Sequence, residues 1–363
     1  MGGKIMVIAL FYGGKSCEHE VSVATGKQVY ALIKNHTVLP VYVSEDGKWL
    51  AVKNIDDRKG KEVSVTPGSP VLKIGKLKSV RPDVAVLCLH GAGGEDGSIQ
   101  GILQSCNIAY TGSGITASAI GLDKSMSKKV FSSCGLPVID YFDVSKTDYE
   151  KKLTTVLERA ESLGYPLIVK PTHLGSSIGV TKVGSGKELL KALAVAFTWD
   201  GSALVEKAIE DFTELNCAVL CGKASEVEKP ARMDEILSYA DKYERGAFKG
   251  VSREFPAVVE QEIYKKVQEY AVTAYTALGA SGIARVDFIL DNVGGTLYVN
   301  EINTIPGSLA LYMFGGASGE GKSGFLSGEA LGAVIAQAEA ENAERNGRKY
   351  RFVKPDKIID GKA

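Results

Sequence analysis

Two uninterrupted apolar segments, each ending in glycine, constrain the fold of this 363-residue chain more than any other feature. They are IMVIALFYGG at residues 5–14 and DVAVLCLHG at residues 83–91. A strand that is apolar at every position is buried on both faces, which is typical of parallel sheets covered by helices. Between them, SVATGKQVYALIK at residues 22–34 has apolar side chains near helical spacing. The N-terminal third is therefore predicted to be an α/β unit with a parallel sheet.

The polar segments that follow these two strands indicate where a ligand would bind. Ligands of parallel α/β sheets lie at the carboxyl ends of the strands. The segments GGKSCEHE at 13–20 and HGAGGEDG at 90–97 both fall there. His90 could contact a substrate from this position, or it could be a structural histidine whose nitrogens are satisfied inside the protein. The sequence leaves both interpretations open.

Charge and the length of apolar runs exclude several classes of function. The chain has 43 Lys and Arg against 43 Asp and Glu, whereas nucleic-acid and anionic-membrane binders need a large basic field. The longest apolar run, residues 5–12, is far shorter than the roughly 20 residues that span a bilayer. The six cysteines form no CxxC pair, which is typical of reduced thiols in a chain of this length. We therefore predict a cytoplasmic protein that binds neither nucleic acid nor membrane.

A predicted hairpin carries the clearest chemistry. The strand sequences IARVDFIL and TLYVNEIN flank the turn sequence DNVGG. Residues two apart share one face of a strand, so Arg285 lies beside Asp287, and Glu301 beside Asn303. Antiparallel pairing would gather these oxygen-bearing side chains into a site for Mg²⁺ shared with phosphate, and Arg285 would face a developing anion. A surface ladder of ion pairs is the alternative.

A glycine- and serine-rich loop, KPTHLGSSIG at 170–179, is a second candidate site. Backbone N–H groups of such a loop bind phosphate, and the preceding Lys170 supplies positive charge. An ordinary flexible hairpin loop is the alternative. A strand is expected after this loop, whereas the P-loop and the dinucleotide-binding turn both open a helix. Two matches to those motifs, at 316–323 and 112–117, lack the required surroundings and are rejected.

These motifs, taken in this order, resemble the D-alanine–D-alanine ligases of the ATP-grasp superfamily. The resemblance extends from about Ile5 to Gly307. It rests on GGKSCEHEVS (13–22), HGAGGEDGSIQG (90–101), YTGSGITASAIGLDKSMSK (110–128), VKPTHLGSSIGVTKV (169–183), VEKAI (205–209), ADKY (240–243), ARVDFIL (284–290) and NEINTIPGS (300–308).

The resemblance implies a three-domain ATP-grasp architecture of the α/β and α+β classes. An N-terminal parallel α/β domain would span residues 1–121, a central subdomain 122–208, and a C-terminal subdomain 209–363. A lid loop would span residues 225–257, where the sequence is polar and aperiodic. The implied reaction uses ATP to convert one D-alanine into an acyl phosphate, from which the amine of a second D-alanine displaces phosphate. The dipeptide would serve peptidoglycan synthesis.

The resemblance also assigns roles to individual residues, which we state as expectations. Catalytic roles fall on Glu20, Ser176, Tyr243, Arg285 and Gly307. Glu20 would hold the ammonium of the first D-alanine and would form a hydrogen-bonded trio with Ser176 and Tyr243. Substrate-binding roles fall on Glu20, His90, Lys242, Ser308 and Tyr312. ATP-binding roles fall on Lys124, Lys170, Ser176, Ser177, Glu206, Lys207, Ile209, Glu214, Lys242 and Asn303. Two Mg²⁺ ions, or Mn²⁺, would bind Asp287, Glu301 and Asn303.

One position departs from the family's pattern. The family places a serine that helps to hold the acceptor's carboxylate where this chain has Tyr312. The hydroxyl of Tyr312 could donate from a longer arm, or Ser308 could compensate. D-serine or another amino acid is therefore the alternative acceptor, while Tyr243 favours D-alanine over D-lactate. The family further implies a homodimer. A non-catalytic nucleotide-binding protein and a dinucleotide-dependent oxidoreductase are the alternatives from other classes.

Overall fold

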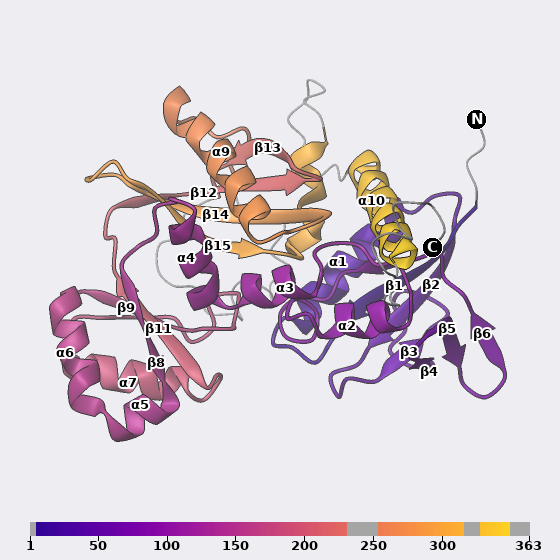
Figure 1. The fold of residues 1–363 in the computed structure, drawn as a ribbon, viewed down its shortest axis with the longest axis horizontal. Helices are drawn as coiled ribbons and strands as arrows, with labels where there is room; N and C mark the ends of the chain where they lie inside the picture. Colours follow the sequence, from indigo (N-terminus) through magenta and orange to yellow (C-terminus); the bar gives the residue numbers. More distant parts are fainter. Residues whose placement is uncertain (1–4, 231–252, 316–326, 349–363) are drawn as a thin grey trace, which may run out of the picture.

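The structure, a computed structural model, describes residues 5–230, 253–315 and 327–348. Its strands form three sheets, and three hydrophobic cores accompany them. Figure 1 shows the seven-stranded sheet at one end of the molecule and the four-stranded sheet of β8–β11 at the other, with β12–β15 between them. The predicted fold class, which combines α/β and α+β parts, is confirmed.

The seven-stranded sheet has the strand order β6-β5-β4-β3-β2-β1-β7. Its strands are β1 (Val7–Gly13), β2 (Thr37–Val43), β3 (Trp49–Ala51), β4 (Lys61–Thr66), β5 (Ser69–Ile74), β6 (Lys78–Val80) and β7 (Val84–Leu87). β1 pairs in parallel with β2 and β7, as predicted. From β2 to β6 the strands pair antiparallel, an extension that the sequence analysis did not predict.

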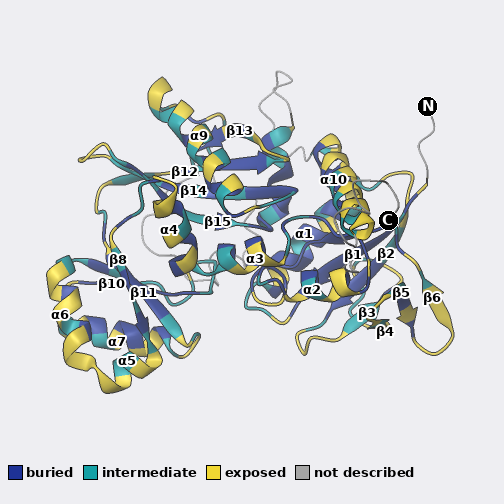
Figure 2. Cartoon of the chain, viewed as in Figure 1, coloured by how far each residue is buried: buried dark blue, intermediate teal, exposed yellow. Residues whose placement is uncertain are grey.

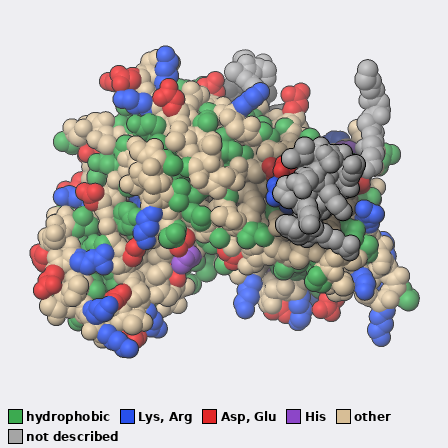
Figure 3. All heavy atoms as spheres, viewed as in Figure 1, with side chains coloured by type: hydrophobic (Ala, Val, Ile, Leu, Met, Phe, Trp, Pro, Cys, Tyr) green, Lys and Arg blue, Asp and Glu red, His purple; other side chains and the backbone are tan. Residues whose placement is uncertain are grey.

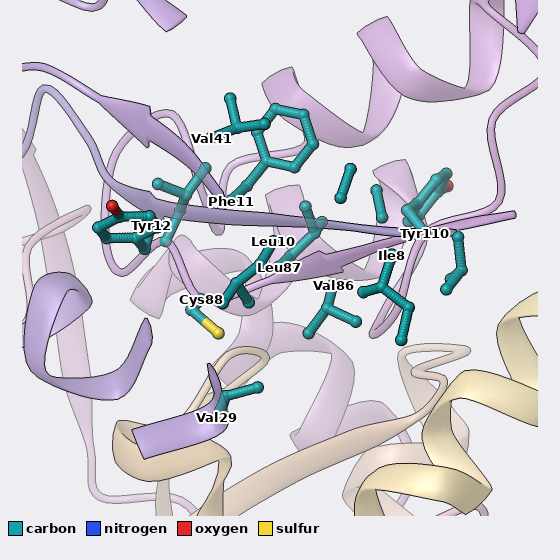
Figure 4. Packing of buried hydrophobic residues seen from close by; sticks show 14 of the residues in the cluster. Ile8, Leu10, Phe11, Tyr12, Val29, Val41, Val86, Leu87, Cys88 and Tyr110 are labelled. Carbon is teal, nitrogen blue, oxygen red and sulfur yellow. The ribbon is translucent and has the colours of Figure 1, made fainter. Parts of the chain in front are cut away.

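The two apolar strands form the centre of the first core. Ile8, Leu10 and Phe11 of β1 and Val86 of β7 have no exposed surface, and Figure 4 shows them packed together. Burying each such side chain stabilises the fold by about 1.5–3 kcal/mol. Helices α1 (His19–Leu32), α2 (Ser98–Ser105) and α10 (Gly328–Gly347) contribute residues to the same core.

The β8–β11 sheet is antiparallel, with the order β10-β9-β11-β8. Its elements are β8 (Tyr141–Ser145), α5 (Lys146–Lys151), α6 (Leu153–Leu163), β9 (Leu167–Pro171), β10 (Thr181–Val183), α7 (Gly186–Ala196) and β11 (Ser202–Lys207). The Ser185 hydroxyl accepts a hydrogen bond from the Glu188 N–H at 3.4 Å and thereby caps the N-terminus of α7. The glycine- and serine-rich loop joins β9 to β10, so a strand does follow it.

The third sheet has the order β13-β12-β14-β15. Its elements are β12 (Phe212–Leu220), β13 (Lys223–Glu228), α9 (Gln261–Ala277), β14 (Ile283–Asp291) and β15 (Leu297–Asn303). α3 (Ile115–Leu122) and α4 (Lys124–Ser133) pack on β15, and the 3₁₀ segment η1 (Gly307–Phe314) follows that strand. The predicted hairpin is confirmed as β14 and β15.

Some packing crosses the expected boundaries at 121 and 208, which stay predictions. Phe131 of α4 lies in the core of the third sheet, and Leu331 of α10 in that of the first. Figure 2 shows that the strands are largely buried and that the helices are exposed on their outer faces. The expected lid at 225–257 was partly wrong, because its first residues up to Glu228 belong to β13.

The surface charges and the helices can be compared with the prediction that the chain binds neither nucleic acid nor membrane. On the face shown in Figure 3, basic and acidic side chains are interspersed. Within the described ranges, no helix combines the length and the apolar character needed to cross a membrane. All six cysteines lie in those ranges, and all are free thiols.

Candidate active site

Loops and strands from all three sheets line one pocket of about 440 Å³. Its floor is the β14–β15 hairpin, and its walls include the loop after β7 and the glycine- and serine-rich loop. The predicted site residues that line it are His90, Ser176, Ser177, Glu214, Arg285, Asp287, Glu301, Asn303, Gly307, Ser308 and Tyr312. The tertiary structure thus brings together residues that lie more than 200 positions apart in the sequence.

The hairpin presents its polar residues as predicted. Asp287 is paired with Glu301, and Arg285 with Asn303, across the antiparallel register. The Arg285 guanidinium donates to both Asp287 carboxylate oxygens, from Nε at 2.6 Å and from a terminal nitrogen at 2.7 Å. Asn303 Nδ2 donates to the same carboxylate at 2.9 Å. The four side chains therefore form one connected polar face.

Two predicted lysines lie beside this face. Lys124 Nζ lies 3.2 Å from Glu301 Oε2 and donates to the Leu174 carbonyl at 2.7 Å. Lys170 forms an ion pair with the buried carboxylate of Glu206. Burial alone would raise the pKa of Glu301, but the ammonium groups of Lys124 and Lys170 outweigh burial and lower it to about 2. Glu301 is therefore an anion at neutral pH.

The residues on this face fit a divalent cation that also binds phosphate. Asp287, Glu301 and Asn303 carry only oxygen as potential metal ligands, and hard cations such as Mg²⁺ prefer oxygen. Two carboxylates and one amide are too few to enclose an ion, which suits a metal that keeps water or phosphate oxygens. No cluster of three or more His, Cys, Asp or Glu side chains suited to a metal occurs among the described residues. Asn303 would therefore complete this ligand set.

The expected role of Glu20 is contradicted by the structure. The Ser176 hydroxyl donates to Glu18 Oε1 at 2.5 Å, and Glu18 rather than Glu20 lines the pocket. The Glu20 side chain is 66% exposed and lies 4.0 Å from His19. α1 begins at His19, so Glu18 is the residue that precedes the helix. Two residues later, at 3.6 residues per turn, Glu20 faces the opposite side.

The error has a local cause that the sequence could have revealed. Glu20 was assigned through the resemblance alone, and the expected helical segment began at Ser22, so no helical register distinguished Glu18 from Glu20. With the start at His19, only Glu18 reaches the glycine- and serine-rich loop. A Cβ on Gly175 would lie 3.0 Å from both Glu18 carboxylate oxygens, so this loop has room for the carboxylate because Gly175 lacks a side chain.

A further carboxyl group, that of Glu95, was not singled out by the sequence analysis. It is buried beside Glu18 and accepts backbone N–H bonds from Ile305 at 2.7 Å and from Gly91 at 2.9 Å. Burial, and then the Glu18 charge, raise the pKa of Glu95 to about 8. Glu95 thereby ties the loop after β7 to the turn after β15. The sequence feature that could have identified Glu95 is its position two residues before Gly97, in the glycine-rich segment at 90–97.

His90 lines the pocket, but both of its nitrogens have partners within the protein. Nδ1 lies 2.6 Å from the Ile305 carbonyl and Nε2 lies 2.8 Å from the Thr25 hydroxyl. Burial lowers the pKa of His90 to about 4, so the ring is neutral. Because a carbonyl only accepts, Nδ1 carries the proton and Thr25 donates to Nε2. The structural interpretation of His90 is thus favoured over substrate contact.

Four further residues that were expected to bind ATP are placed less uniformly. Glu214 lines the pocket, whereas Glu206, Lys207 and Ile209 do not. Glu206 is buried between Lys170 and Lys128, with 3.2 Å to Lys128 Nζ, and Lys207 is exposed. Their proposed contacts with ATP stay predictions. The expected lid residues Lys242 and Tyr243 lie outside the described residues.

Tyr312 lines the pocket together with Glu228 and Arg253. Its hydroxyl donates to Glu228 Oε2 at 2.9 Å. The Arg253 guanidinium stacks on the Tyr312 ring, 4.5 Å from the centroid, and lies 3.2 Å from Glu228 Oε1. Glu228 and Arg253 were not predicted as site residues. We call Glu228, Arg253 and Tyr312 the acceptor-end cluster.

Solved structures share this architecture. The D-alanine–D-alanine ligase from Coxiella burnetii matches with a TM-score of 0.79 at 24% identity, covering 99% of this chain and 100% of that one. The VanG D-Ala:D-Ser ligase from Enterococcus faecalis matches with a TM-score of 0.77 at 29% identity, covering 92% and 100%. The fold is the ATP-grasp fold, and the pocket lies between its sheets.

Sequence comparison defines the family more closely. The family models described as "D-ala D-ala ligase N-terminus" and "D-ala D-ala ligase C-terminus" match residues 7–113 and 130–321. The D-alanine–D-alanine ligase of Thermosipho africanus is 36% identical over 326 residues, which cover 85% of this chain and 88% of that protein. That of Enterococcus hirae is 34% identical, covering 85% and 90%. The chain belongs to the D-alanine–D-alanine ligase family and is a ligase.

Proposed function

We propose that this ligase uses ATP and Mg²⁺ to join two D-alanines through a D-alanyl phosphate, in the synthesis of peptidoglycan precursors. The observation that supports this proposal most is the union of three features in and directly beside one pocket. The Arg285–Asp287–Glu301–Asn303 face and the Glu18 carboxylate held by Ser176 line the pocket, and Lys124 lies beside it, 3.2 Å from Glu301. Family membership supports the same reaction.

The reaction needs charge neutralisation more than covalent catalysis by the protein. The carboxylate of the first D-alanine attacks the γ-phosphorus of ATP, and ADP leaves. The amine of the second D-alanine then attacks the acyl carbon, and the C–O bond to phosphate breaks. We assign Lys124 and Lys170 to the phosphates, and Arg285 with the Gly307 N–H to the oxyanion. Mg²⁺ at Asp287, Glu301 and Asn303 would neutralise phosphate oxygens, with two ions or Mn²⁺ as our finer expectation.

Glu18 takes the role that the sequence analysis gave to Glu20. Burial raises the pKa of Glu18, and the Ser176 hydrogen bond and the Lys124 charge oppose that rise. A partly buried carboxylate at this position is suited to the ammonium of the first D-alanine, because an ion pair gains strength when it is shielded from water. Lys242 and Tyr243 retain their proposed roles in the lid.

D-serine is the second candidate acceptor. Tyr312 is the observation that keeps it open, since the family's acceptor serine is absent. The structural similarity to a D-Ala:D-Ser ligase also supports D-serine as a candidate acceptor. We further propose that the protein is located in the cytoplasm and that it forms a homodimer. Native mass spectrometry of the purified chain would test the homodimer.

Phosphate release from ATP and Mg²⁺ tests the proposal, with single and paired amino acids as substrates. D-alanine alone should yield one phosphate per D-alanyl-D-alanine formed, with product identified by mass spectrometry. Turnover only with a D-alanine and D-serine pair would move the acceptor to D-serine. No turnover with any pair would overturn the proposed function.

A further inference from the structure

The acceptor-end cluster raises the question of which group receives the acceptor's carboxylate. This question rests on the proposed function, because it concerns the second D-amino acid of that reaction. Among the described residues, two cations line the pocket, Arg253 and Arg285. The Arg285 guanidinium already binds both oxygens of Asp287 through Nε and one terminal nitrogen. Arg285 is therefore oriented by the hairpin and not by the acceptor end.

Tyr312 is not suited to replace the family's serine as a donor. Its single hydroxyl proton is directed to Glu228 Oε2 at 2.9 Å. Burial, and then the Glu228 charge, raise the pKa of Tyr312, so the phenol stays protonated and keeps donating to Glu228. Ser308 does not offer its backbone N–H either, because that group donates to the Thr25 hydroxyl at 3.1 Å.

Arg253 has the properties that these groups lack. A guanidinium has five N–H donors in a planar fork that matches a carboxylate. In the structure its ion pair is with Glu228, through one terminal nitrogen at 3.2 Å. The Tyr312 ring supports its flat face, and Glu228 is almost wholly buried, at 4% side-chain exposure. Arg253 itself keeps 26% of its side chain exposed, so its other donors can face the pocket.

We propose that Arg253 binds the carboxylate of the acceptor amino acid, with Tyr312 as the platform and Glu228 as the anchor of its guanidinium. The cluster is a specificity device for an acceptor that carries a free α-carboxylate. Glu228 prevents free rotation of the arginine, and the two opposite charges leave the end of the pocket neutral before the acceptor binds. The anionic acceptor then adds a partner to a cation that is already oriented, which lowers the entropic cost of binding.

The test compares two acceptors that differ only in this group, D-alanine and D-alaninamide. Both are offered to the enzyme with ATP, Mg²⁺ and D-alanine as donor, and the two dipeptide products are separated by mass. The wild-type chain should prefer the acid in kcat/KM. In Arg253→Met we expect the acceptor KM for D-alanine to rise about 10- to 100-fold, with the KM values of ATP and the donor unchanged. The preference for the acid over the amide should fall by a similar factor.

Arg159→Met is a matched control. Arg159 also stacks on an aromatic ring, Phe142, with the guanidinium 4.5 Å from the centroid. It belongs to α6 and does not line the pocket, so its loss should leave the ratio unaltered. Arg253→Lys, which keeps the charge but loses the fork, should restore part of the preference. Thermal unfolding of each variant separates a loss of fold from a loss of recognition.

The possible outcomes are distinct. A wild-type chain that forms no dipeptide overturns the proposed function and this inference with it. A wild-type chain that turns over, combined with an Arg253→Met variant that keeps the same acid-to-amide ratio, overturns the inference alone. A purely structural role of Arg253 would lower activity toward both acceptors equally, which also overturns it.

Discussion

The two ends of the pocket are built on different principles. At the phosphate end, Glu301 and Asp287 are paired with Lys124 and Arg285, and all four side chains come from a hairpin or from helix α4. At the acceptor end, one buried carboxylate, Glu228, orients a cation on an aromatic ring. The comparison teaches that the charges we propose for phosphoryl transfer are placed by regular elements, while the proposed contact with the acceptor depends on a few side chains from separate segments.

Loss of the Glu301 carboxylate, which we propose as a metal ligand, should have the largest effect and would break the comparison at the phosphate end. We expect Glu301→Gln to lower kcat by at least about a hundredfold, to the point of abolished turnover, while the far-ultraviolet circular dichroism stays native. The group lies at the end of β15, outside the core.

Glu344→Gln is the control for that variant, because Glu344 is an exposed carboxylate on α10 paired with Arg348 at 2.8 Å. It should leave turnover unchanged. Activity of Glu301→Gln equal to that of the control would contradict the metal assignment.

The next largest effect concerns two glutamates that lie two residues apart, Glu18 and Glu20, and it tests which of them binds the donor. Glu18→Gln keeps the shape that accepts the Ser176 hydroxyl but removes the charge that would hold the first ammonium. Its kcat/KM for the donor D-alanine should fall about 10- to 100-fold. Glu20→Gln, at an exposed position, should behave as wild type in the same steady-state assay. The reverse ranking would restore the original assignment to Glu20.

At the acceptor end, removal of a single hydroxyl should have a smaller effect. Tyr312→Phe keeps the platform for Arg253 but deprives Glu228 of its donor at 2.9 Å. The acceptor KM should rise about 2- to 10-fold, which corresponds to the net value of one typical hydrogen bond, because the hydroxyl acts on the acceptor only through Glu228 and Arg253.

Tyr149→Phe provides the comparison for this change. The Tyr149 hydroxyl donates to the Leu190 carbonyl at 3.4 Å in the β8–β11 unit, away from the pocket lining. An equal rise in acceptor KM in both variants would show that the acceptor end has no special role for the Tyr312 hydroxyl.

The smallest effect concerns His173, which anchors the glycine- and serine-rich loop. Its ring lies 3.4 Å from Asp123 and 2.9 Å from Asp200, and hydrogen bonds to Asp123 and Asp200 raise the pKa of His173 to about 9. A raised pKa means that the protonated ring stabilises the fold. That contribution is complete below about pH 6.5, the unfolded value, and is lost as pH rises through about 9.

Thermal unfolding of wild type and His173→Gln between pH 6 and pH 10 measures this contribution. Wild type should be more stable at pH 6 by about 1 kcal/mol or less, because the side chain is 44% exposed and solvent screens the pairs. The difference should vanish near pH 10. A difference that does not depend on pH would exclude protonated His173 as the anchor.

Much of the phosphate end could be predicted because its determinants are local. The face shared by Arg285 and Asp287 follows from the two-residue period of a strand, and the turn sequence DNVGG fixes which strands pair. The N-cap at Ser185 is likewise set by residues three apart. Each of these features depends on a short stretch of chain, so a single sequence contains the information.

The choice between Glu18 and Glu20 lay at the limit of such reasoning. Both belong to one motif, and the helical register that separates them depends on α1 beginning at His19 and not at Ser22. The antiparallel strands β4 to β6 were missed for a related reason, because their segments are short and largely exposed and therefore have little hydrophobic periodicity.

The sequence by itself determined the family, the class of fold and the hairpin face, since these depend on local patterns and ordered motifs. Only the tertiary structure decided that Tyr312 donates to Glu228, that Arg253 stacks on Tyr312, and that Glu95 bonds the Ile305 N–H. Tyr312 and Glu228 lie 84 positions apart, and Glu95 and Ile305 lie 210 apart. Contacts over such separations arise from the packing of whole sheets and helices, which no local pattern in a single sequence specifies.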